Sequence, residues 1–288
     1  MNHPVELLAQ AYLKDIVNNK TKMDSDTIET VVNDIRDALH RQFAGETRQE
    51  FRLRPSNLGR PKCQLWFDKN KPNKASDLPS NFVINMFLGD VVEAIFKGIL
   101  RAMKVEFQDN GKIDLDVDGE NITGEYDLIL NGKVDDVKSA SAWSYKHKFD
   151  NYSSLAEHDA FGYIPQLAIY SEGTGADVGG WWVINKGNGE FKYVSAEQMD
   201  KDAVMKEVRS TVAYINNDEP FERCYEPIPE TYRGKESGNM VLPKECHFCK
   251  YKYDCWDNIQ ELPSKVSKAK EPPIVAVSYT HLTLPTKA

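Results

Sequence analysis

The sequence lacks any apolar run long enough to span a membrane, and its first residues show no basic segment followed by an apolar one. A transmembrane helix needs about 20 consecutive apolar residues, and a secretory signal needs that basic-to-apolar order. We therefore expect a cytoplasmic protein that does not associate with membranes.

A surplus of positive charge is also missing. The 44 acidic residues outnumber 36 lysines and arginines and leave a net charge of −8. Proteins that coat nucleic acids are basic throughout, so this class is excluded. A nuclease is not excluded, because the acidic residues of its site lower the total. Basic residues are nevertheless dense between positions 41 and 62, where they either meet a phosphate backbone or form a solvated surface.

The second pair of cysteines that a zinc ribbon requires is absent. The chain has five cysteines, at Cys63, Cys224, Cys246, Cys249 and Cys255. In a reducing compartment such residues are metal ligands or free thiols more often than disulfides. One distant cysteine with a compact C-terminal trio fits a [4Fe–4S] cluster better than zinc, which has Cys₄ sites with two C-x₂-C pairs. We expect Cys63 to be the fourth ligand. Cys224 is the alternative, and His247 is a candidate zinc ligand only if one of the cysteines is free.

Apolar spacing and turn residues predict the order of the elements. Helices are expected within residues 5–44, with Asp24 or Ser25 as a cap, and at about 82–103, 165–171 and 196–216. Strands are expected at 111–117, 124–130, 133–139, 181–184 and 191–194. Residues 51–79 and the chain from 225 onward are expected to be irregular. This order predicts an α/β fold with a mixed central sheet flanked by helices, N-terminal helices and a C-terminal cysteine cluster.

The strongest local signal is the Asn131-Gly132 pair between two alternating runs. Asn-Gly in this context is typical of a two-residue β-hairpin turn. If these two residues form the turn, Leu130 pairs with Lys133 and the rest of the register follows residue by residue.

That register places Asp127 directly opposite Asp136, with Lys138 on the same face. Two carboxylates about 5 Å apart at Cβ repel each other unless a cation lies between them. Hard oxygen ligands suit Mg²⁺ or Mn²⁺, and a neighbouring lysine can orient a water. The alternative is a solvated acidic hairpin in which Glu125 pairs with Lys138.

Two helices add polar residues to this hypothesis. Glu93 lies among apolar residues of the helix expected at 82–103, where a carboxylate is unfavourable unless it is paired or bound to metal. Its alternative partner is Lys97, one turn further on. Gln166 and Tyr170 share one face of another helix, from which they either contact the site or pack at the surface.

The order of these motifs resembles the RecB-like branch of the PD-(D/E)XK nucleases. The matching motifs are Gly89-x₃-Glu93, Gly124-x₂-Asp127, Asp136-x-Lys138 and Gln166-x₃-Tyr170. The segment from Ser56 to Trp66, which contains Cys63, and the C-terminal cysteines resemble the iron–sulfur subset, which includes AddB, CRISPR-associated RecB-like exonucleases and phage relatives. The resemblance covers residues 51–257. Many relatives carry histidine where this chain has Glu93.

The resemblance implies a restriction-endonuclease-like core that hydrolyses DNA, as an exonuclease in repair, recombination or phage DNA processing. It implies Mg²⁺ or Mn²⁺ held by Glu93, Asp127, Asp136 and the Val137 carbonyl. Lys138 would position the attacking water, and Gln166 and Tyr170 would steady the site. The cluster bound by Cys63, Cys246, Cys249 and Cys255 would be structural.

The implied partners are single-stranded DNA or duplex ends, with a helicase or a recombination or spacer-acquisition protein. The alternative is a non-catalytic iron–sulfur or zinc DNA-binding subunit of a larger complex. We expect an N-terminal helical segment at 1–50, a nuclease domain at 51–260 and a tail at 261–276. Residues 277–288 resemble a translated sequencing adaptor, and we expect them to be an assembly scar.

Overall fold

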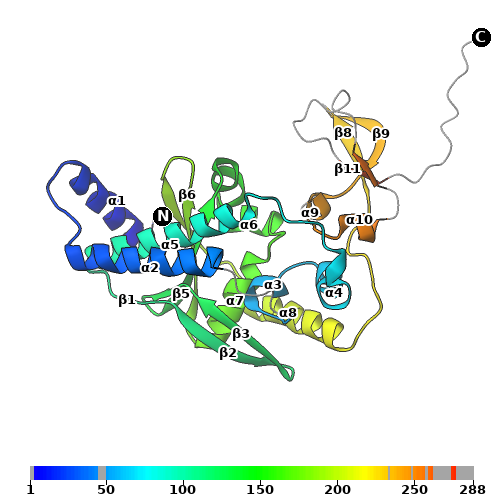
Figure 1. Ribbon diagram of the computed structural model, residues 1–288, viewed down its shortest axis with the longest axis horizontal. Coiled ribbons are helices and arrows are strands. Elements are labelled where there is room, and N and C mark those ends of the chain that lie inside the picture. Colours follow the sequence, from blue (N-terminus) through cyan, green and yellow to red (C-terminus); the bar gives the residue numbers. More distant parts are fainter. Residues whose placement is uncertain are drawn as a thin grey trace, which may run out of the picture. The chain divides into compact units, whose positions relative to one another are not determined.

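The computed structural model describes residues 3–44, 50–232, 234–247, 249–256, 259–261 and 274–276 (Figure 1). The chain divides into two compact units. The first comprises Met1–Arg60 with Pro79–Asn217, and the second comprises Pro61–Leu78 with Asp218–Ala288. The expected adaptor-derived segment at 277–288 lies outside the described residues. The expected domain boundaries at residues 50 and 260 stay predictions.

The first unit is built on a five-stranded sheet in the order β1-β4-β5-β6-β7. Its strands are β1 (Phe107–Gln108), β4 (Leu128–Leu130), β5 (Lys133–Ala140), β6 (Asp177–Asn185) and β7 (Phe191–Ser195). Strands β5 and β6 are parallel, and the other neighbours are antiparallel. A separate two-stranded sheet pairs β2 (Gly111–Val117) with β3 (Glu120–Tyr126). The predicted α/β fold with a mixed central sheet is confirmed.

The helices of this unit are α1 (Pro4–Val17), α2 (Ser25–Phe43), α3 (Pro55–Leu58), α5 (Phe82–Ala102), α6 (Tyr152–Glu157), α7 (Tyr163–Thr174) and α8 (Lys201–Asn216), with a π-helical turn at Ser144–Lys148. The predicted helices are present, and α3, α6 and the π-helical turn are additional. Asp24 caps α2, because its Oδ1 accepts a hydrogen bond from Thr27 N at 2.8 Å. Among the described residues no helix is both long and apolar enough to cross a membrane.

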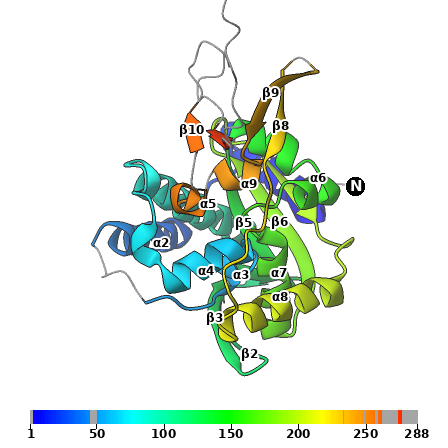
Figure 2. The ribbon, with the colours of Figure 1, turned by 90° about the vertical axis from the view of Figure 1, so that its right-hand side faces the viewer.

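Helix α5 covers one face of the sheet. Its Phe96 and Leu100 are buried in one core cluster with Leu128, Val137 and Trp182. Full burial of such side chains contributes about 1.5–3 kcal/mol each. Because side chains alternate along β5, Val137 faces α5 while its neighbours face the other side, which α7 covers (Figure 2).

The hairpin has the predicted turn and register. Asn131 and Gly132 have φ of 53° and 75°, as a turn with two left-handed residues requires. Leu130 pairs with Lys133, and the ladder continues to the pair Leu128–Asp135. The strand expected at 124–130 is in fact two strands, because β3 ends at Tyr126 and β4 begins at Leu128 in a different sheet. The residue at this crossing is Asp127.

A close backbone contact fixes the start of α7. A Cβ atom on Gly59, after α3, would lie 2.4 Å from Gly162 Cα, and Gly162 has a left-handed φ of 76°. Neither position tolerates a side chain without displacing the other segment. The contact therefore ties α3 to the first turn of α7, from which Gln166 projects.

The second unit combines two segments that are distant in the chain. Helix α4 (Lys62–Asn70) and a 3₁₀ turn (Pro72–Lys74) pack with α9 (Lys244–His247) and α10 (Lys252–Cys255). The Phe67 and Tyr251 rings stack at 5.0 Å, and Tyr251 donates a hydrogen bond to Asp68 at 2.6 Å. Strands β8 (Ile228–Tyr232), β9 (Lys235–Val241), β10 (Ile259–Glu261) and β11 (Ile274–Ala276) form a small sheet. The expectation of irregular structure at 51–79 and beyond 225 is therefore wrong.

Candidate active site

The three hairpin residues singled out from the sequence lie together. Asp127 Oδ2 accepts a hydrogen bond from Val137 N at 2.7 Å, and Asp136 Oδ2 lies 2.6 Å from Lys138 Nζ. The Asp136 side chain is 2% exposed and the Lys138 side chain 18%. The predicted alternative, a pair between Glu125 and Lys138, does not occur, since Glu125 bonds to Asn110. The function of the Val137 carbonyl stays a prediction.

Helix α7 extends this group by the two residues predicted for it. Lys138 donates a hydrogen bond to Gln166 Oε1 at 3.3 Å, and Gln166 Nε2 donates one to Tyr170 OH at 3.2 Å. The sequence did not indicate Tyr163, whose ring centroid lies 5.0 Å from Lys138 Nζ. Lys138 is thus held by a carboxylate, an amide and a ring face.

Lys138 stays protonated at neutral pH. Burial opposes its charge, but the carboxylates of Asp136 and Asp127 outweigh burial and raise its pKa. A protonated lysine cannot take up a proton from water. It can stabilise a developing negative charge and orient a water, which are the functions we assigned to it from the resemblance.

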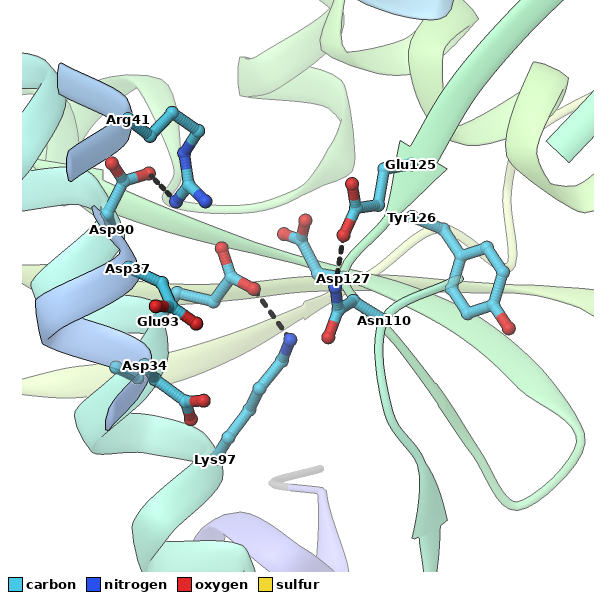
Figure 3. Close-up of a pocket in the computed structure, with 11 residues that line it drawn as sticks. Asp34, Asp37, Arg41, Asp90, Glu93, Lys97, Asn110, Glu125, Tyr126 and Asp127 are labelled. Carbon is cyan, nitrogen blue, oxygen red and sulfur yellow. Dashed lines mark hydrogen bonds and ion pairs between the residues drawn. The ribbon is translucent and has the colours of Figure 1, made fainter. Parts of the chain in front are cut away.

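Glu93 belongs to the same region but already has a partner. Its Oε1 lies 2.6 Å from Lys97 Nζ, the neighbour one helical turn away that the sequence offered as the alternative. Lys97, whose side chain is 4% exposed, also pairs with Asp109 at 3.0 Å. Figure 3 shows Glu93 and Asp127 facing one another across a pocket. The pocket therefore joins the α5 carboxylate to the hairpin.

This pocket has a volume of about 360 Å³ and an acidic lining. Besides Glu93, Lys97 and Asp127, its charged lining residues are Asp34, Asp37, Arg41, Asp90 and Glu125. Three of them come from α2, which the family resemblance does not cover. They were not predicted, because nothing local in a sequence shows which face of a distant helix packs beside a site.

The carboxylates raise one another's pKa. Burial and then the charge of Asp127 raise the pKa of Glu93 to about 7. Burial and then the charge of Asp136 raise the pKa of Asp127 to about 7. Burial also raises the pKa of Asp136. Mutually repelling carboxylates suit a hard divalent cation. In the described part of the chain, however, no three His, Cys, Asp or Glu residues converge closely enough to hold a metal ion.

Asp135 is also a buried carboxylate, but it has a different environment and was not predicted. It accepts hydrogen bonds from Gly180 N at 2.8 Å, Trp182 Nε1 at 3.0 Å and Tyr193 OH at 2.9 Å. Burial raises its pKa to about 7 despite these donors. Gly180 lies in a bulge of β6, where two residues oppose one in β5, and a Cβ on the adjacent Gly179 would lie 2.0 Å from Asp135 Oδ1. Asp135 therefore stabilises the sheet beneath the site.

Metal-free stability should depend on pH through Asp127. Its folded pKa of about 7 exceeds the ordinary value of about 4. Between these values the folded state binds more protons than the unfolded state, so stability falls as pH rises from about 4 to 7 and then levels off. We expect Asp127→Asn to become progressively more stable than the wild type over this range, as measured by urea unfolding in EDTA.

Glu125→Gln is the control for this experiment, because Glu125 neighbours Asp127 in the chain but is exposed. Its stability should follow that of the wild type across the same pH range. If the free energy of unfolding varied with pH in the same way for Asp127→Asn and the wild type, Asp127 would be ionised in the folded protein over this range.

All five cysteines belong to the second unit. Cys246, Cys249 and Cys255 lie in one apolar cluster with Phe67 and Trp256 among others. Burial, and then the neighbouring Cys249 and Cys255, raise the pKa of Cys246 to about 12. A metal ion binds cysteines as thiolates, so binding a metal would release the thiol protons and make this grouping favourable. His247 Nε2 is buried and has no hydrogen-bond partner among the described residues. This nitrogen is therefore a candidate ligand for the alternative metal, zinc.

Cys224, predicted to be the spare cysteine, lies beside Cys63. Its Sγ accepts a hydrogen bond from Cys63 N at 3.1 Å. A thiol hydrogen bond between the two, the largest cause in both cases, raises the pKa of Cys63 and lowers that of Cys224 to about 7. Cys63 and Cys224 therefore lie close enough together for either to be a candidate fourth ligand.

Comparison with known proteins gives no functional assignment. No protein family matches the chain, and no curated protein is significantly similar to it. One similar solved structure is the crystal structure of SSO0001, at 15% sequence identity and a TM-score of 0.43, covering 76% of this chain and 92% of that one. Function is therefore inferred from the residues of this chain.

Proposed function

We propose that the protein is a divalent-metal-dependent DNA nuclease, acting as an exonuclease in repair, recombination or phage DNA processing. The observation that supports this most is the group formed by Asp127, Asp136, Lys138, Gln166 and Tyr170. Residues from the crossing between β3 and β4, from β5 and from α7 come together there in the order that resembles the RecB-like nucleases.

Each residue has a defined task in this proposal. Asp127, Asp136 and Glu93 would hold Mg²⁺ or Mn²⁺, which polarises phosphate and lowers the pKa of bound water. Lys138 stays charged, orients the attacking water and stabilises negative charge on the phosphate. Gln166 and Tyr170 keep the Lys138 side chain in place through the hydrogen-bonded chain.

The test is an assay on end-labelled single- and double-stranded DNA with Mg²⁺, Mn²⁺ or EDTA. We expect cleavage in either metal, none in EDTA, and products that shorten progressively from one end. Absence of cleavage on every substrate would favour the second candidate, a non-catalytic DNA-binding subunit that works with a helicase or recombination partner. One observation favours that candidate: Lys138 already neutralises Asp136.

For the second unit we propose a structural [4Fe–4S] cluster bound by Cys63, Cys246, Cys249 and Cys255. The support is the chemistry of the donors, since soft thiolates suit iron–sulfur clusters, and the gathering of all four in one unit. Such a group would tie α4 to the C-terminal segment, closing a long loop of chain.

Cys63→Ser should remove the cluster and cause aggregation, because α4 loses its covalent link to α9 and α10. Protein purified without oxygen should be brown and contain iron and acid-labile sulfide, and the variant should lose both. The matched control is Cys224→Ser, which should retain them. The reverse result would identify Cys224 as the fourth ligand. Colourless protein with stoichiometric zinc would replace the cluster by a zinc site, with His247 as a candidate ligand.

A further inference from the structure

Three arginines of the first unit lie close together. Arg52 and Arg54 precede α3, and Arg60 follows it. The positive charges of Arg52 and Arg60 act on Arg54, and together with burial, the larger cause, they lower its pKa. Three like charges repel one another, so such a cluster is unfavourable unless anions lie nearby.

Carboxylates do not provide that compensation. Elsewhere in this unit Arg41, Arg101 and Arg209 form ion pairs with aspartates. None of the three clustered arginines forms an ion pair with a carboxylate of the described residues, although the chain carries 44 acidic residues. In addition, Arg60 Nε is buried and has no hydrogen-bond partner in this part of the chain. A buried donor without a partner can be satisfied by an acceptor from outside the chain, such as a phosphate oxygen or a water.

The cluster is fixed in position beside the candidate active site. Arg52 Nη1 donates a hydrogen bond to Thr123 Oγ1 at 2.8 Å, on the strand that leads to Asp127. The Gly59–Gly162 backbone contact anchors the other end of α3 to α7, as the neighbouring ribbons in Figure 2 also show. The charge of Arg60 reaches Tyr163, whose ring contacts Lys138.

We propose that Arg52, Arg54 and Arg60 bind non-scissile backbone phosphates of a DNA strand whose next phosphate lies at the carboxylates. This proposal rests on the proposed nuclease function and names contacts of its substrate. Arginine suits phosphate because its planar guanidinium donates two parallel hydrogen bonds. The cluster also explains how an acidic protein with an acidic pocket holds a polyanion: the binding charge is local, not global.

The experiment measures binding without cleavage. Anisotropy of a fluorescein-labelled single-stranded oligonucleotide is recorded in EDTA over a series of salt concentrations. Each phosphate contact contributes about 0.7 to the slope of log K against log salt for a single strand. We expect Arg54→Gln and Arg60→Gln each to lower the slope by about this amount and to weaken binding on the order of tenfold. The loss should be equal on different base sequences, because phosphate contacts carry no sequence information.

Arg209→Gln is the matched control, because Arg209 is already paired with Asp118, at 3.2 Å. Its slope should equal that of the wild type. Arg60→Lys keeps the charge and should retain most of the slope, and equal melting temperatures would show that the variants are folded. Competition with inorganic phosphate at constant ionic strength identifies the source of the anion, and a strand-binding site should be displaced only weakly.

The outcomes separate this inference from the proposed function. An unchanged slope in both glutamine variants, while the wild type still cleaves DNA, would overturn the arginine site alone. Reduced slopes without any cleavage would support the arginine site and reject the nuclease. Strong displacement by inorganic phosphate with unchanged oligonucleotide slopes would show a small-anion site and overturn the proposal.

Discussion

Replacing Asp136 by asparagine is expected to lower the rate of DNA cleavage at least about 10²-fold, the range typical of removing one group that stabilises the transition state. The substitution preserves shape but removes the carboxylate charge that lies 2.6 Å from Lys138 Nζ. It should not unfold the protein, because asparagine occupies the same space and the charge of Asp127 still stabilises the Lys138 ammonium. Cleavage of end-labelled DNA and urea unfolding are measured on the same preparation.

Normal cleavage by Asp136→Asn, with contaminating nuclease excluded, would reject the assignment of this site. Lys138→Ala makes a useful comparison, because it should reduce the rate while leaving metal binding largely intact. If Lys138→Ala instead abolished metal-dependent stabilisation, Lys138 would have a structural function.

Replacing the neighbouring Asp135 by alanine should have the opposite effect: a large loss of stability and a small loss of activity. It leaves Gly180 N, Trp182 Nε1 and Tyr193 OH without their acceptor. A buried group left unsatisfied costs about 1–3 kcal/mol, so the free energy of unfolding should fall by on the order of 3 kcal/mol or more. Activity per folded molecule should fall far less than in Asp136→Asn, because Asp135 points to the opposite face of β5.

Asp135 and Asp136 are adjacent in β5, so the variants at each position serve as controls for those at the other. A variant at Asp135 that unfolds at the same urea concentration as the wild type would show that the three hydrogen bonds contribute little. The stability of Asp135→Asn should lie between those of the wild type and Asp135→Ala. Its side-chain oxygen can still accept a hydrogen bond, while its amide nitrogen must face a donor.

The hairpin could be predicted because its determinants are local. Asn131 and Gly132 supply the two left-handed residues of the turn, and a side-chain period of two then fixes which residues face each other. The i, i+4 spacing placed Gln166 and Tyr170 on one helix face by the same kind of short-range reasoning.

Other features depend on tertiary contacts that a single sequence does not display. Asp135 and Asp136 are the same residue type, but the β6 bulge, Trp182 and Tyr193 give Asp135 hydrogen-bond donors that Asp136 on the opposite face does not have. The Gly179-Gly180 pair was an unused signal, since glycines inside a strand often mark a bulge. Helix α4 was missed because it is short, lies between Pro61 and Pro72, and packs through Phe67 on residues far along the chain.

The second unit is formed by two separate segments of the chain, and this has a consequence during synthesis. Residues 61–78 leave the ribosome before the whole of 79–217, yet they fold with residues that follow 217. At about 5–20 residues per second, Cys63 waits on the order of ten seconds or more before Cys246 is made. Until then Phe67 lacks Tyr251, the ring on which it stacks, and Cys63 cannot be buried against the C-terminal cysteines. We expect nascent chains to depend on a holding chaperone over this interval, and a circular permutant that joins the two segments to lose that dependence.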